Sequence, residues 1–464
     1  MSATFSTNPS FSLTFRVELP NRPGMLSMLI KALADGGGML GQIDLIQQNR
    51  KISVRDITVY ASSSEHEDEL ISIVKLLDEV KLLEVRDRTF DLHKGGKIAV
   101  QPKRLLKGQD DLAMAYTPGV GRVCLAIATK PPKVYEYTIK GNTVAVVTDG
   151  SAVLGLGNIG AEAALPVMEG KAMLFKEFAG IDAFPICLAT QEVEAIIQAV
   201  KYIAPSFGGI NLEDIAAPSC FEIEKRLRQE LDIPVFHDDQ HGTAIVATAA
   251  LLNALKIVHK DIATIKIVIN GAGASGIAVG RLLRKAGAQK IVMCDSKGAL
   301  GRDRPDLTSE KLEFVGDETG NLAQVIKGAD VFIGLSKGGV LTAEMVRTMA
   351  ERRVVFAMAN PIPEIQPELV VNDVAVMATG RSDYPNQINN VLAFPGVFRG
   401  ALDARVKQIN EPMCLAAAYA IASLVSQQEL APDMIIPSVF DKRVASTVAA
   451  AVQQSAREQG LAQA

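Results

Sequence analysis

The feature that most constrains the fold of this 464-residue chain is a glycine-rich turn, Gly271-Ala272-Gly273-Ala274-Ser275-Gly276. It directly follows Ile265–Asn270, a β-branched run typical of a strand, and precedes Ile277–Lys285, which is predicted to be a helix. Gly271 permits the tight turn, Gly273 lets the backbone approach a phosphate, and Gly276 lets helix and strand pack closely. The turn therefore predicts a Rossmann-like parallel sheet that binds the pyrophosphate of a dinucleotide at the start of the helix.

A second predicted strand, Ile291–Asp295, ends in an acid about 20 residues after the turn, where a carboxylate can accept hydrogen bonds from the adenosine ribose. We expect Asp295 to favour NAD, because it would repel a 2′-phosphate. Lys297 and Arg302 lie close in the sequence, so NADP stays open. A second GxGxxG pattern, Gly155–Gly160, does not directly follow a strand and lacks such an acid. We interpret it as a loop of the substrate domain.

The N-terminal part, about residues 11–91, is predicted to form strand, helix, two strands, helix and strand. This is the order of a ferredoxin-like βαββαβ fold. Together with the turn Asn21–Leu26, the order resembles an ACT domain, a family whose members often sense amino acids and often pair with one another. The resemblance implies an amino-acid or metabolite effector near Asn21 and Gly24. A dimerisation module without a ligand is the alternative.

Two pairs of adjacent acids stand out in the region before the glycine turn, Glu213 with Asp214 and Asp238 with Asp239. Both pairs lie next to apolar runs typical of strands. Adjacent carboxylates repel one another in water, but a hard cation such as Mg²⁺ or Mn²⁺ prefers carboxylate oxygens. The spacing therefore indicates a metal site, with two solvated acidic turns as the alternative.

Lys171 and Tyr116 are candidates for acid–base chemistry. Lys171 lies in the apolar stretch Val167–Phe175, and burial can lower the pKa of a lysine so that it acts as a base. A lysine that buries only its stem at the surface is the commoner case. Tyr116 stands beside the turn Thr117-Pro118-Gly119, where a tyrosine by itself is usually a packing residue.

Six ordered stretches resemble the malic enzymes, specifically the shorter bacterial type, over about residues 98–440. These stretches are Ala115–Val120, Val147–Gly160, Val167–Pro185, Asn211–Ile215, Phe236–Thr243 and Asn386–Gly396. An ACT domain fused in front is similar to some bacterial members. The resemblance implies oxidative decarboxylation of (S)-malate to pyruvate and CO₂, with reduction of NAD or NADP and with Mg²⁺ or Mn²⁺.

The resemblance also implies roles for the polar residues already named. Tyr116 matches the general acid of the family and Lys171 its general base. The positions that match the metal ligands are Glu213, Asp214 and Asp239. Asp238 matches the acid beside the last ligand.

Two asparagines, Asn360 and Asn390, match residues that hold the substrate near the nicotinamide. One departure from the family pattern concerns Ala152, because larger eukaryotic members carry a substrate-binding arginine at that position. Which group holds the distal carboxylate of malate is therefore open at the level of the sequence.

Three alternatives to this activity remain open. A malolactic enzyme would make lactate from malate and keep its cofactor bound, and the sequence hardly separates the two. An ACT-regulated amino-acid dehydrogenase would also join a sensor to a Rossmann unit, but it would not need the acid pairs. A regulator that senses a dinucleotide would leave the acid pairs, Lys171 and Tyr116 unexplained.

Composition narrows the partners and the location. Apolar residues make up 48% of the chain and the net charge is −4, which gives no field to attract nucleic acid or anionic lipid. The apolar stretch Met413–Val425 is too short to span a membrane. Five dispersed cysteines without a CxxC pair favour the cytoplasm. We expect malate as the small-molecule partner and a homodimer or larger homo-oligomer.

The predicted organisation has four parts. Residues 1–95 are the ACT-like domain and residues 96–245 the substrate domain. Residues 246–385 form the Rossmann domain, and residues 386–464 a helical segment that packs back on the catalytic core.

Overall fold

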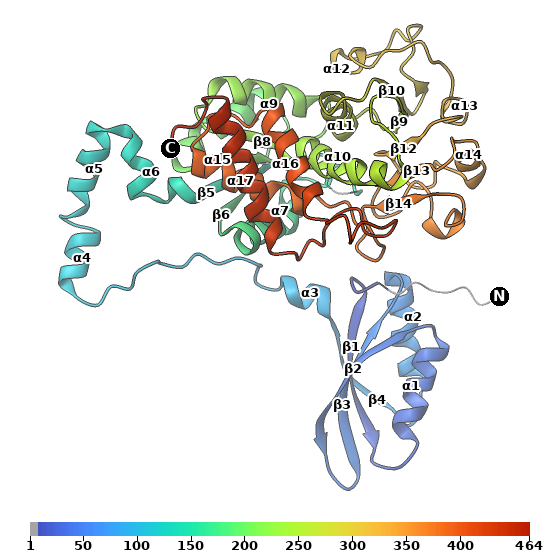
Figure 1. The fold of residues 1–464 in the computed structure, drawn as a ribbon. Helices are drawn as coiled ribbons and strands as arrows, with labels where there is room; N and C mark the ends of the chain where they lie inside the picture. The colour runs from blue at the N-terminus through green and yellow to red at the C-terminus, as the bar shows by residue number, and fades with distance from the viewer. Residues whose placement is uncertain (1–7, 154) are drawn as a thin grey trace. The chain divides into compact units, whose positions relative to one another are not determined.

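The computed structural model describes residues 8–153 and 155–464, which separate into two compact units, divided between Ala99 and Val100. The N-terminal unit is a four-stranded sheet with two helices on one face (Figure 1). Its elements are β1 (Ser12–Pro20), α1 (Met25–Asp35), β2 (Met39–Gln48), β3 (Ile52–Tyr60), α2 (Ser64–Lys75), β4 (Lys81–Asp87) and α3 (Arg88–His93). The strand order is β2-β3-β1-β4 and every neighbouring pair is antiparallel. The βαββαβ order predicted from the sequence is confirmed.

The last strand of this unit ends earlier than the sequence suggests. The sequence predicts a last strand over about Leu82–Phe90 and a linker at His93–Lys97, but β4 ends at Asp87. The Asp87 carboxylate accepts hydrogen bonds from the backbone N–H groups of Thr89 and Phe90. These bonds cap the short helix α3, because a side-chain oxygen satisfies amide groups that have no partner in the first helical turn.

The first half of the second unit is a parallel sheet of four strands in the order β6-β5-β7-β8. Its strands are β5 (Thr143–Thr148), β6 (Asp182–Cys187), β7 (Gly209–Leu212) and β8 (Val235–His237). The helices of this region are α6 (Val134–Tyr137), α7 (Ala161–Ala179), α8 (Val193–Ile203) and α9 (Ser219–Glu230), with 3₁₀ turns at Pro131–Lys133, Ile139–Asn142 and Ala204–Ser206. The pattern Gly155–Gly160 lies in the loop between β5 and α7, as expected for a substrate-domain loop.

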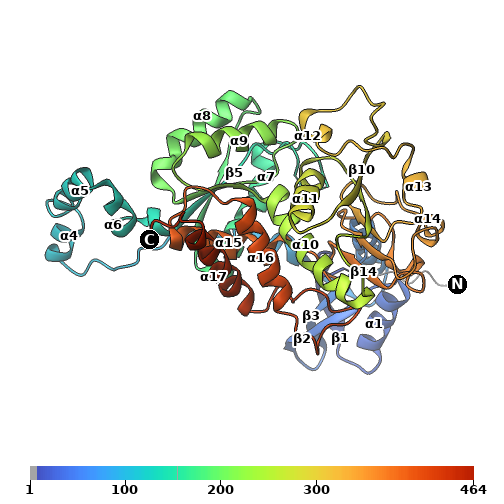
Figure 2. The same ribbon diagram turned by 45° about the horizontal axis from the view of Figure 1, so that its top comes forward.

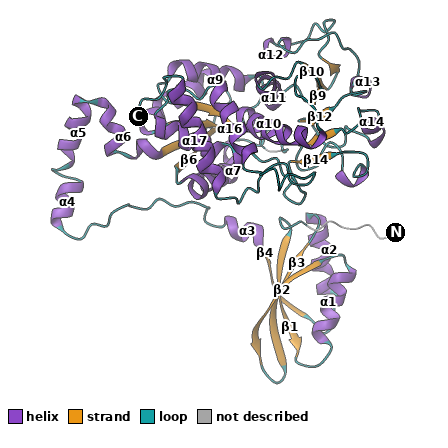
Figure 3. Cartoon of the chain, viewed as in Figure 1, coloured by secondary structure: helices purple, strands orange, loops and turns teal. Residues whose placement is uncertain are grey.

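The second half contains the Rossmann-like sheet, in the order β11-β10-β9-β12-β13-β14. Its strands are β9 (Lys266–Asn270), β10 (Lys290–Asp295), β11 (Gly298–Ala299), β12 (Val331–Gly334), β13 (Val354–Ala357) and β14 (Val376–Thr379). All neighbours are parallel except β10 and β11. The helices are α11 (Ala274–Lys285), α12 (Ser309–Leu312), α13 (Leu322–Val325) and α14 (Ala343–Arg347), with a 3₁₀ turn at Pro367–Leu369. Much of the chain between β11 and β12 is loop (Figure 3). The parallel α/β fold predicted from the glycine turn is confirmed.

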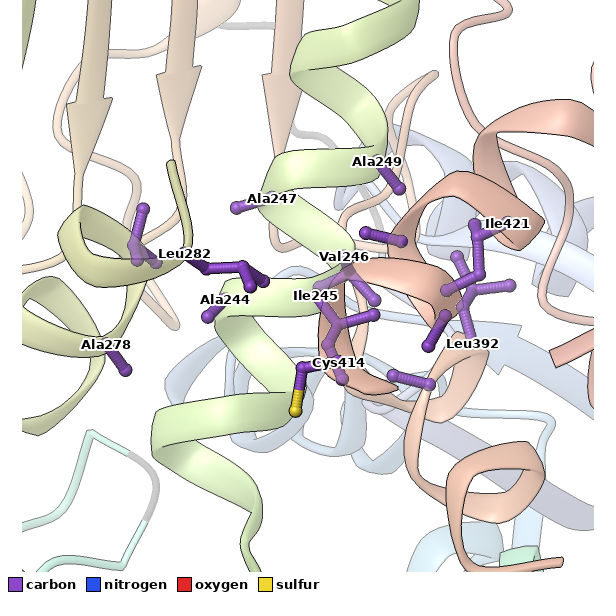
Figure 4. Close-up of a cluster of buried hydrophobic side chains, with 14 of the residues drawn as sticks. Ala244, Ile245, Val246, Ala247, Ala249, Ala278, Leu282, Leu392, Cys414 and Ile421 are labelled. Atoms are coloured by element: carbon purple, nitrogen blue, oxygen red, sulfur yellow. The ribbon is translucent and has the colours of Figure 1, made fainter. Parts of the chain in front are cut away.

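Helix α10 (Asp238–Val258) connects the two sheets and is mostly buried. It packs against α11 on one side and against α16 (Glu411–Ser423) on the other (Figures 2 and 4). Alanines such as Ala244 and Ala247 let these neighbours approach, and Leu282 and Ile421 fill the space between the helices. Residues from both sheets, α10 and the C-terminal helices belong to one buried apolar cluster.

The C-terminal helices α15 (Phe394–Ala404), α16 and α17 (Arg443–Glu458) pack on one another, and α15 also contacts α7. A short 3₁₀ turn, Asn390–Leu392, precedes α15. The polar composition after Gln453 suggests a weakly ordered tail, but α17 continues to Glu458. Val452 and Ala456 are buried, so one apolar face of α17 holds this segment in place.

Two helices near the start of the second unit, α4 (Gln109–Ala115) and α5 (Val120–Thr129), contain no buried residue. Their exposed apolar side chains include Leu112, Met114 and Leu125. Gln109–Thr129 and Asp238–Val258 are both long and apolar enough to cross a membrane. The second stretch is α10, a mostly buried core helix. Core helices of soluble proteins can be as long and as apolar as membrane helices, so these two stretches are weak evidence for a membrane span.

Candidate active site

Lys171 lies on α7 beside the face that packs on the core. Met168, Ala172 and Phe175 are buried on that face, and the lysine at its edge keeps only 11% of its side chain exposed. Its Nζ lies 2.5 Å from Asp238 Oδ2 and 2.9 Å from Glu213 Oε1. Nζ also lies 4.3 Å from the ring centroid of Phe394. The structure therefore brings the predicted base together with two of the predicted acids.

The four acids meet because they follow neighbouring parallel strands. Glu213 and Asp214 come directly after β7, and Asp238 and Asp239 come directly after β8. In a parallel sheet the carboxyl ends of such strands lie at the same edge. The backbone N–H of Asp214, a residue with φ of 53°, donates to Asp239 Oδ2 at 2.9 Å.

Three of these carboxylates can share one cation. Glu213, Asp214 and Asp239 each offer an oxygen, and the three oxygens lie within 4.8 Å of one another. Lys171 is the cation that pairs with both Glu213 and Asp238, so one ammonium faces two carboxyl groups of the cluster. Oxygen-only donors with excess negative charge fit Mg²⁺ or Mn²⁺.

The electrostatics of Lys171 differ from the sequence expectation. Burial by itself lowers the pKa of Lys171, but the charges of Asp238 and Glu213 outweigh this effect and raise the pKa above its ordinary value. Burial raises the pKa of Glu213 well above its usual range, with Asp239 and Asp238 adding to the effect and Lys171 opposing it. The expected net lowering of the lysine pKa was wrong, because the sequence does not show which acids face the lysine.

The two candidate substrate residues come from different segments. Asn390 Nδ2 donates to Asp238 Oδ2 at 3.2 Å, and Thr243 Oγ1 donates to Asn390 Oδ1 at 3.2 Å. Asn360 follows β13 and precedes a cis peptide bond to Pro361. The backbone carbonyl of Asn360 lies against Gly155, where a Cβ atom would come within 2.4 Å of the carbonyl oxygen. Glycine at position 155 therefore lets the loop that contains Gly155 approach the loop of Asn360 this closely.

A buried acid that the sequence analysis missed fixes the loop of Asn360. Glu364 is fully buried, and its carboxylate accepts hydrogen bonds from the backbone N–H groups of Ser336 and Ala359, both at 3.0 Å. It thus joins the loops that follow β12 and β13. A single Glu among prolines gave no sequence signal for this role.

The glycine turn is tightly packed at Gly271 and Gly276 and open at Gly273. Gly271 has φ of 127°, and a Cβ there would lie 2.3 Å from the carbonyl oxygen of Leu335. A Cβ at Gly276 would lie 1.7 Å from the carbonyl oxygen of Gly271. A Cβ at Gly273 would meet no atom within 4 Å, so the backbone there is open to a ligand. Helix α11 begins at Ala274, followed by Ser275, so its first amide groups lie next to this opening.

Asp295 ends β10 next to the turn, since the N–H of Gly271 donates to the carbonyl of Cys294 at 2.8 Å. Its carboxylate pairs with Arg304 and Lys311, at 2.9 Å and 2.7 Å. Burial raises the pKa of Asp295, but hydrogen bonds from Arg304 and Lys311 outweigh it and lower the pKa to about 2.

The side chains that pair with Asp295 are not those of Lys297 and Arg302, the two cations that lie close to it in the sequence. Arg302 pairs instead with Asp317, and Lys297 donates only its backbone N–H to Asp295. Arg304 and Lys311 were missed because they reach Asp295 through an irregular loop that has no sequence periodicity.

Tyr116 is not part of this cluster in the described chain. It follows the last residue of α4, and 67% of its surface is exposed. No residue of α4 or α5 is buried, so these helices do not enter the core of the unit, whereas Lys171 is largely buried. The structure therefore does not bring the predicted general acid to the predicted base of the same chain.

The predicted effector loop of the N-terminal unit is a tight turn. Gly24 has φ of 89° and directly precedes α1. Asn21 Nδ2 donates to the carbonyl of Asn49, and Asn21 Oδ1 accepts from Gln48 Nε2 at 3.0 Å. The Asn21 side chain thus ties this turn to the β2–β3 connection.

Comparison with known proteins shows which family the chain resembles. A family model described as the malic enzyme NAD binding domain matches residues 240–457, and the malic enzyme N-terminal domain matches residues 95–193 and 189–228. The NAD-dependent malic enzyme of Geobacillus stearothermophilus is 56% identical over 458 residues, which are 98% of this chain and 96% of that protein. The bifunctional malic/malolactic enzyme of Bacillus subtilis is 57% identical over 389 residues, 82% of this chain and 95% of that protein.

A solved structure agrees as well. The NAD-dependent malic enzyme of Thermotoga maritima superposes with a TM-score of 0.76 at 49% identity, covering 78% of this chain and 98% of that chain. Two family models match most of the second unit, and the Geobacillus relative extends over nearly the whole chain. The chain belongs to the malic enzyme family.

Proposed function

We propose that the protein catalyses oxidative decarboxylation of (S)-malate to pyruvate and CO₂, with reduction of NAD and a bound divalent cation. The observation that carries the proposal is the contact of Lys171 Nζ with Glu213 and Asp238 beside the three-carboxylate cluster. A general base next to a cation site, on the same unit as a dinucleotide turn, is what oxidation of a metal-chelating hydroxy acid requires.

The chemistry divides among the residues as follows. A divalent cation held by Glu213, Asp214 and Asp239 would polarise the C2 oxygen of malate and stabilise the negative charge that develops there. A dinucleotide held at the glycine turn would provide the hydride acceptor. A cation on Glu213 would offset part of the negative charge that raises the pKa of Lys171, and the neutral Lys171 Nζ then takes the proton of the C2 hydroxyl. Asp238 keeps Nζ in place through its hydrogen bond. After loss of CO₂ from C4, the C3 carbon needs a proton.

We assign that proton to the hydroxyl of Tyr116, and we propose that it comes from a second copy of the chain. The site described above lacks this group, while α4 and α5 hold the tyrosine in an exposed segment with unburied apolar side chains. Exposed apolar patches of this kind mark protein interaction sites. A homodimer that buries α4 and α5 on its partner would complete both sites at once.

The direct test is a spectrophotometric assay of NADH formation with malate, Mn²⁺ and NAD. We expect pyruvate and NADH in equal amounts, with no turnover after removal of the divalent cation. Absence of malate-dependent NADH formation in protein that still binds NADH would refute the proposed reaction. Metal-independent turnover would refute the role of the carboxylate cluster.

Malolactic chemistry is a second candidate, because the Bacillus subtilis relative bears a bifunctional name. The same residues could retain the dinucleotide and reduce pyruvate before it leaves. Lactate without net NADH would identify this reaction. The assay above therefore measures lactate along with pyruvate.

For the N-terminal unit we propose control by a small effector, an amino acid or another metabolite, near Asn21 and Gly24. The βαββαβ architecture and the tight turn support it. Titration of the full-length protein with amino acids, followed by calorimetry, tests it. We place the protein in the cytoplasm, which fits its five free cysteines.

A further inference from the structure

We propose that Asn211 is a positioning residue of the cation site, whose side-chain amide holds the Glu213 carboxylate in the orientation that serves both Lys171 and a divalent cation. The inference rests on the proposed function and deepens it, because Asn211 would act on the cation through one of its ligands. The family resemblance implied no role for Asn211.

The first observation is the place of Asn211 in the fold. It lies inside β7 and is completely buried. Its partners in the sheet are Val146 of β5 and Phe236 of β8, which belong to one buried apolar cluster. Asparagine is depleted in strands, and burial of its amide costs free energy unless the amide is hydrogen-bonded. A polar side chain at this position therefore needs a partner.

The second observation is the partner that Asn211 has. Asn211 Nδ2 donates a hydrogen bond to Glu213 Oε2 at 2.8 Å. Lys171 Nζ lies 2.9 Å from the other carboxylate oxygen, Glu213 Oε1. A neutral amide and an ammonium thus hold the two oxygens of Glu213 separately. Together they fix the rotation of the carboxylate.

The third observation is the other end of the amide. Asn211 Oδ1 is buried and has no hydrogen-bond partner among the described residues. If the amide were turned over, Oδ1 would face the Glu213 carboxylate, and two acceptors repel one another. A leucine has nearly the same shape and would not bury an unsatisfied oxygen. Packing alone therefore does not account for an amide at this position, whereas the contact with Glu213 does.

The contact leaves Glu213 able to bind a cation. A carboxylate has about four acceptor positions, of which Asn211 and Lys171 use two. The amide is neutral, so it orients the carboxylate and leaves its negative charge in place. Residues that orient a metal ligand in this way change metal affinity by about 10- to 100-fold when they are replaced.

The test measures Mn²⁺ binding to the full-length protein, which needs neither malate nor a dinucleotide. Asn211→Leu removes the donor with little change in side-chain shape. In calorimetry we expect Mn²⁺ to bind about tenfold more weakly or worse, while NADH binding stays within about twofold. Asn211→Ala is the second variant, since its smaller side chain fits the same space and should give the same result.

Asn253→Leu is the matched control. Asn253 is also completely buried, and its Nδ2 donates to the backbone carbonyls of Ala422 and Ile435. It lies on α10 roughly 20 Å along the helix from Asp239. The control should lose stability, because two buried carbonyls lose their donor, but its Mn²⁺ affinity should stay within about twofold.

A double variant tests whether Asn211 acts through Glu213. Glu213→Gln removes the charge that the amide orients. Asn211→Leu added to Glu213→Gln should therefore weaken Mn²⁺ by less than about twofold further. A further tenfold loss would show that Asn211 acts independently of Glu213, and the proposal would be wrong.

The remaining outcomes are equally decisive. Unchanged Mn²⁺ affinity in Asn211→Leu or Asn211→Ala would overturn the proposal. Parallel losses of Mn²⁺ and NADH binding, or an equal loss of Mn²⁺ binding in Asn253→Leu, would also overturn it, because they would indicate general damage to the fold. Absence of malate turnover in parent protein that binds Mn²⁺ and NADH would refute the proposed reaction alone.

Discussion

At the scale of the residue, Lys171 occupies the centre of the site because it contacts two acids and one aromatic ring. The sequence identified the lysine and the acids but not which acid it contacts. The three predicted cation ligands and the lysine come from three separate segments, which only the parallel sheet brings together. Two predictions belong to this scale.

Replacement of Lys171 by alanine should reduce kcat for malate oxidation by about 100-fold or more, the usual contribution of a positioned acid–base group. NADH binding should stay within about twofold, because Lys171 lies on α7, far along the chain from the glycine turn. Steady-state kinetics and NADH fluorescence measure the two effects. Lys176→Ala is the control, since that exposed lysine of the same helix pairs with Asp182. Near-normal kcat in Lys171→Ala would contradict the assignment.

Replacement of Asp239 by asparagine should weaken Mn²⁺ binding by about tenfold or more, because one anionic ligand of three is lost. Calorimetric titration of the unliganded protein with Mn²⁺ measures the affinity without reference to activity. Asp317→Asn, which removes an exposed acid far along the chain, is the control. Unchanged Mn²⁺ affinity in Asp239→Asn would remove Asp239 from the ligand set.

At the scale of the element, α9 holds the start of α10 in place through one buried carboxylate. Glu224 Oε1 accepts hydrogen bonds from the backbone N–H of His237 at 3.2 Å and contacts His241 Nε2 at 2.7 Å. These two residues flank the acid pair Asp238 and Asp239. The position of two site acids therefore depends on a contact between helices that no motif in the sequence marks.

The pKa of Glu224 predicts the pH dependence of this contact. Burial alone raises the pKa, but His241 and Arg228 outweigh it and lower the pKa from 4.5 to about 2. A carboxyl whose pKa falls on folding stabilises the fold above its unfolded pKa, and the stabilisation is lost as the pH falls towards about 2.

Glu224→Gln should therefore lower the free energy of unfolding by about 1–3 kcal/mol at pH 7. The difference from the parent protein should shrink below pH 4.5, where the carboxyl of the unfolded chain becomes protonated. Urea unfolding at several pH values measures both effects, with Glu222→Gln on the exposed side of α9 as the control. A difference that stays constant between pH 7 and pH 3 would contradict the linkage.

At the scale of the whole molecule, the described residues of one chain bring together the proposed base and the proposed cation ligands. They do not place a phenol, the proposed proton donor, beside Lys171. Tyr116 is exposed on a segment without buried residues, so the proposed dimer places the site between two copies. A dimer with shared active sites differs from a purely structural dimer in one measurable way. Two variants that are each inactive should regain activity when they form a mixed dimer.

Tyr116→Phe and Lys171→Ala should each be nearly inactive alone. After unfolding and refolding in an equal mixture, activity should return to about a quarter of the parent value, because half of the dimers are mixed and each mixed dimer has one complete site. Turnover per total protein measures the return. No recovery, in a mixture shown to contain mixed dimers by two affinity tags, would place Tyr116 in the site of its own chain.

The sequence by itself determined the local features of this protein. The glycine turn needs only a strand, a turn and a helix in succession, and the structure confirms this succession. The βαββαβ order of the N-terminal unit follows from the spacing of apolar residues along the chain, and it is also confirmed. Two local predictions were wrong. The strand expected over about Leu82–Phe90 ends at Asp87, which caps a helix, and the tail expected to be weakly ordered from Gln453 is helical as far as Glu458.

Only the tertiary structure decided the electrostatics and the completeness of the site. The pKa of Lys171 is raised because Asp238 and Glu213 meet it across the sheet edge, while its neighbours in sequence are apolar. Asp295 is paired with Arg304 and Lys311 through an irregular loop, and Tyr116 is exposed whereas the base that it was expected to serve is largely buried. The physical reason is common to all three. Charge interactions depend on distance in space, and a sequence pattern reports only distance along the chain.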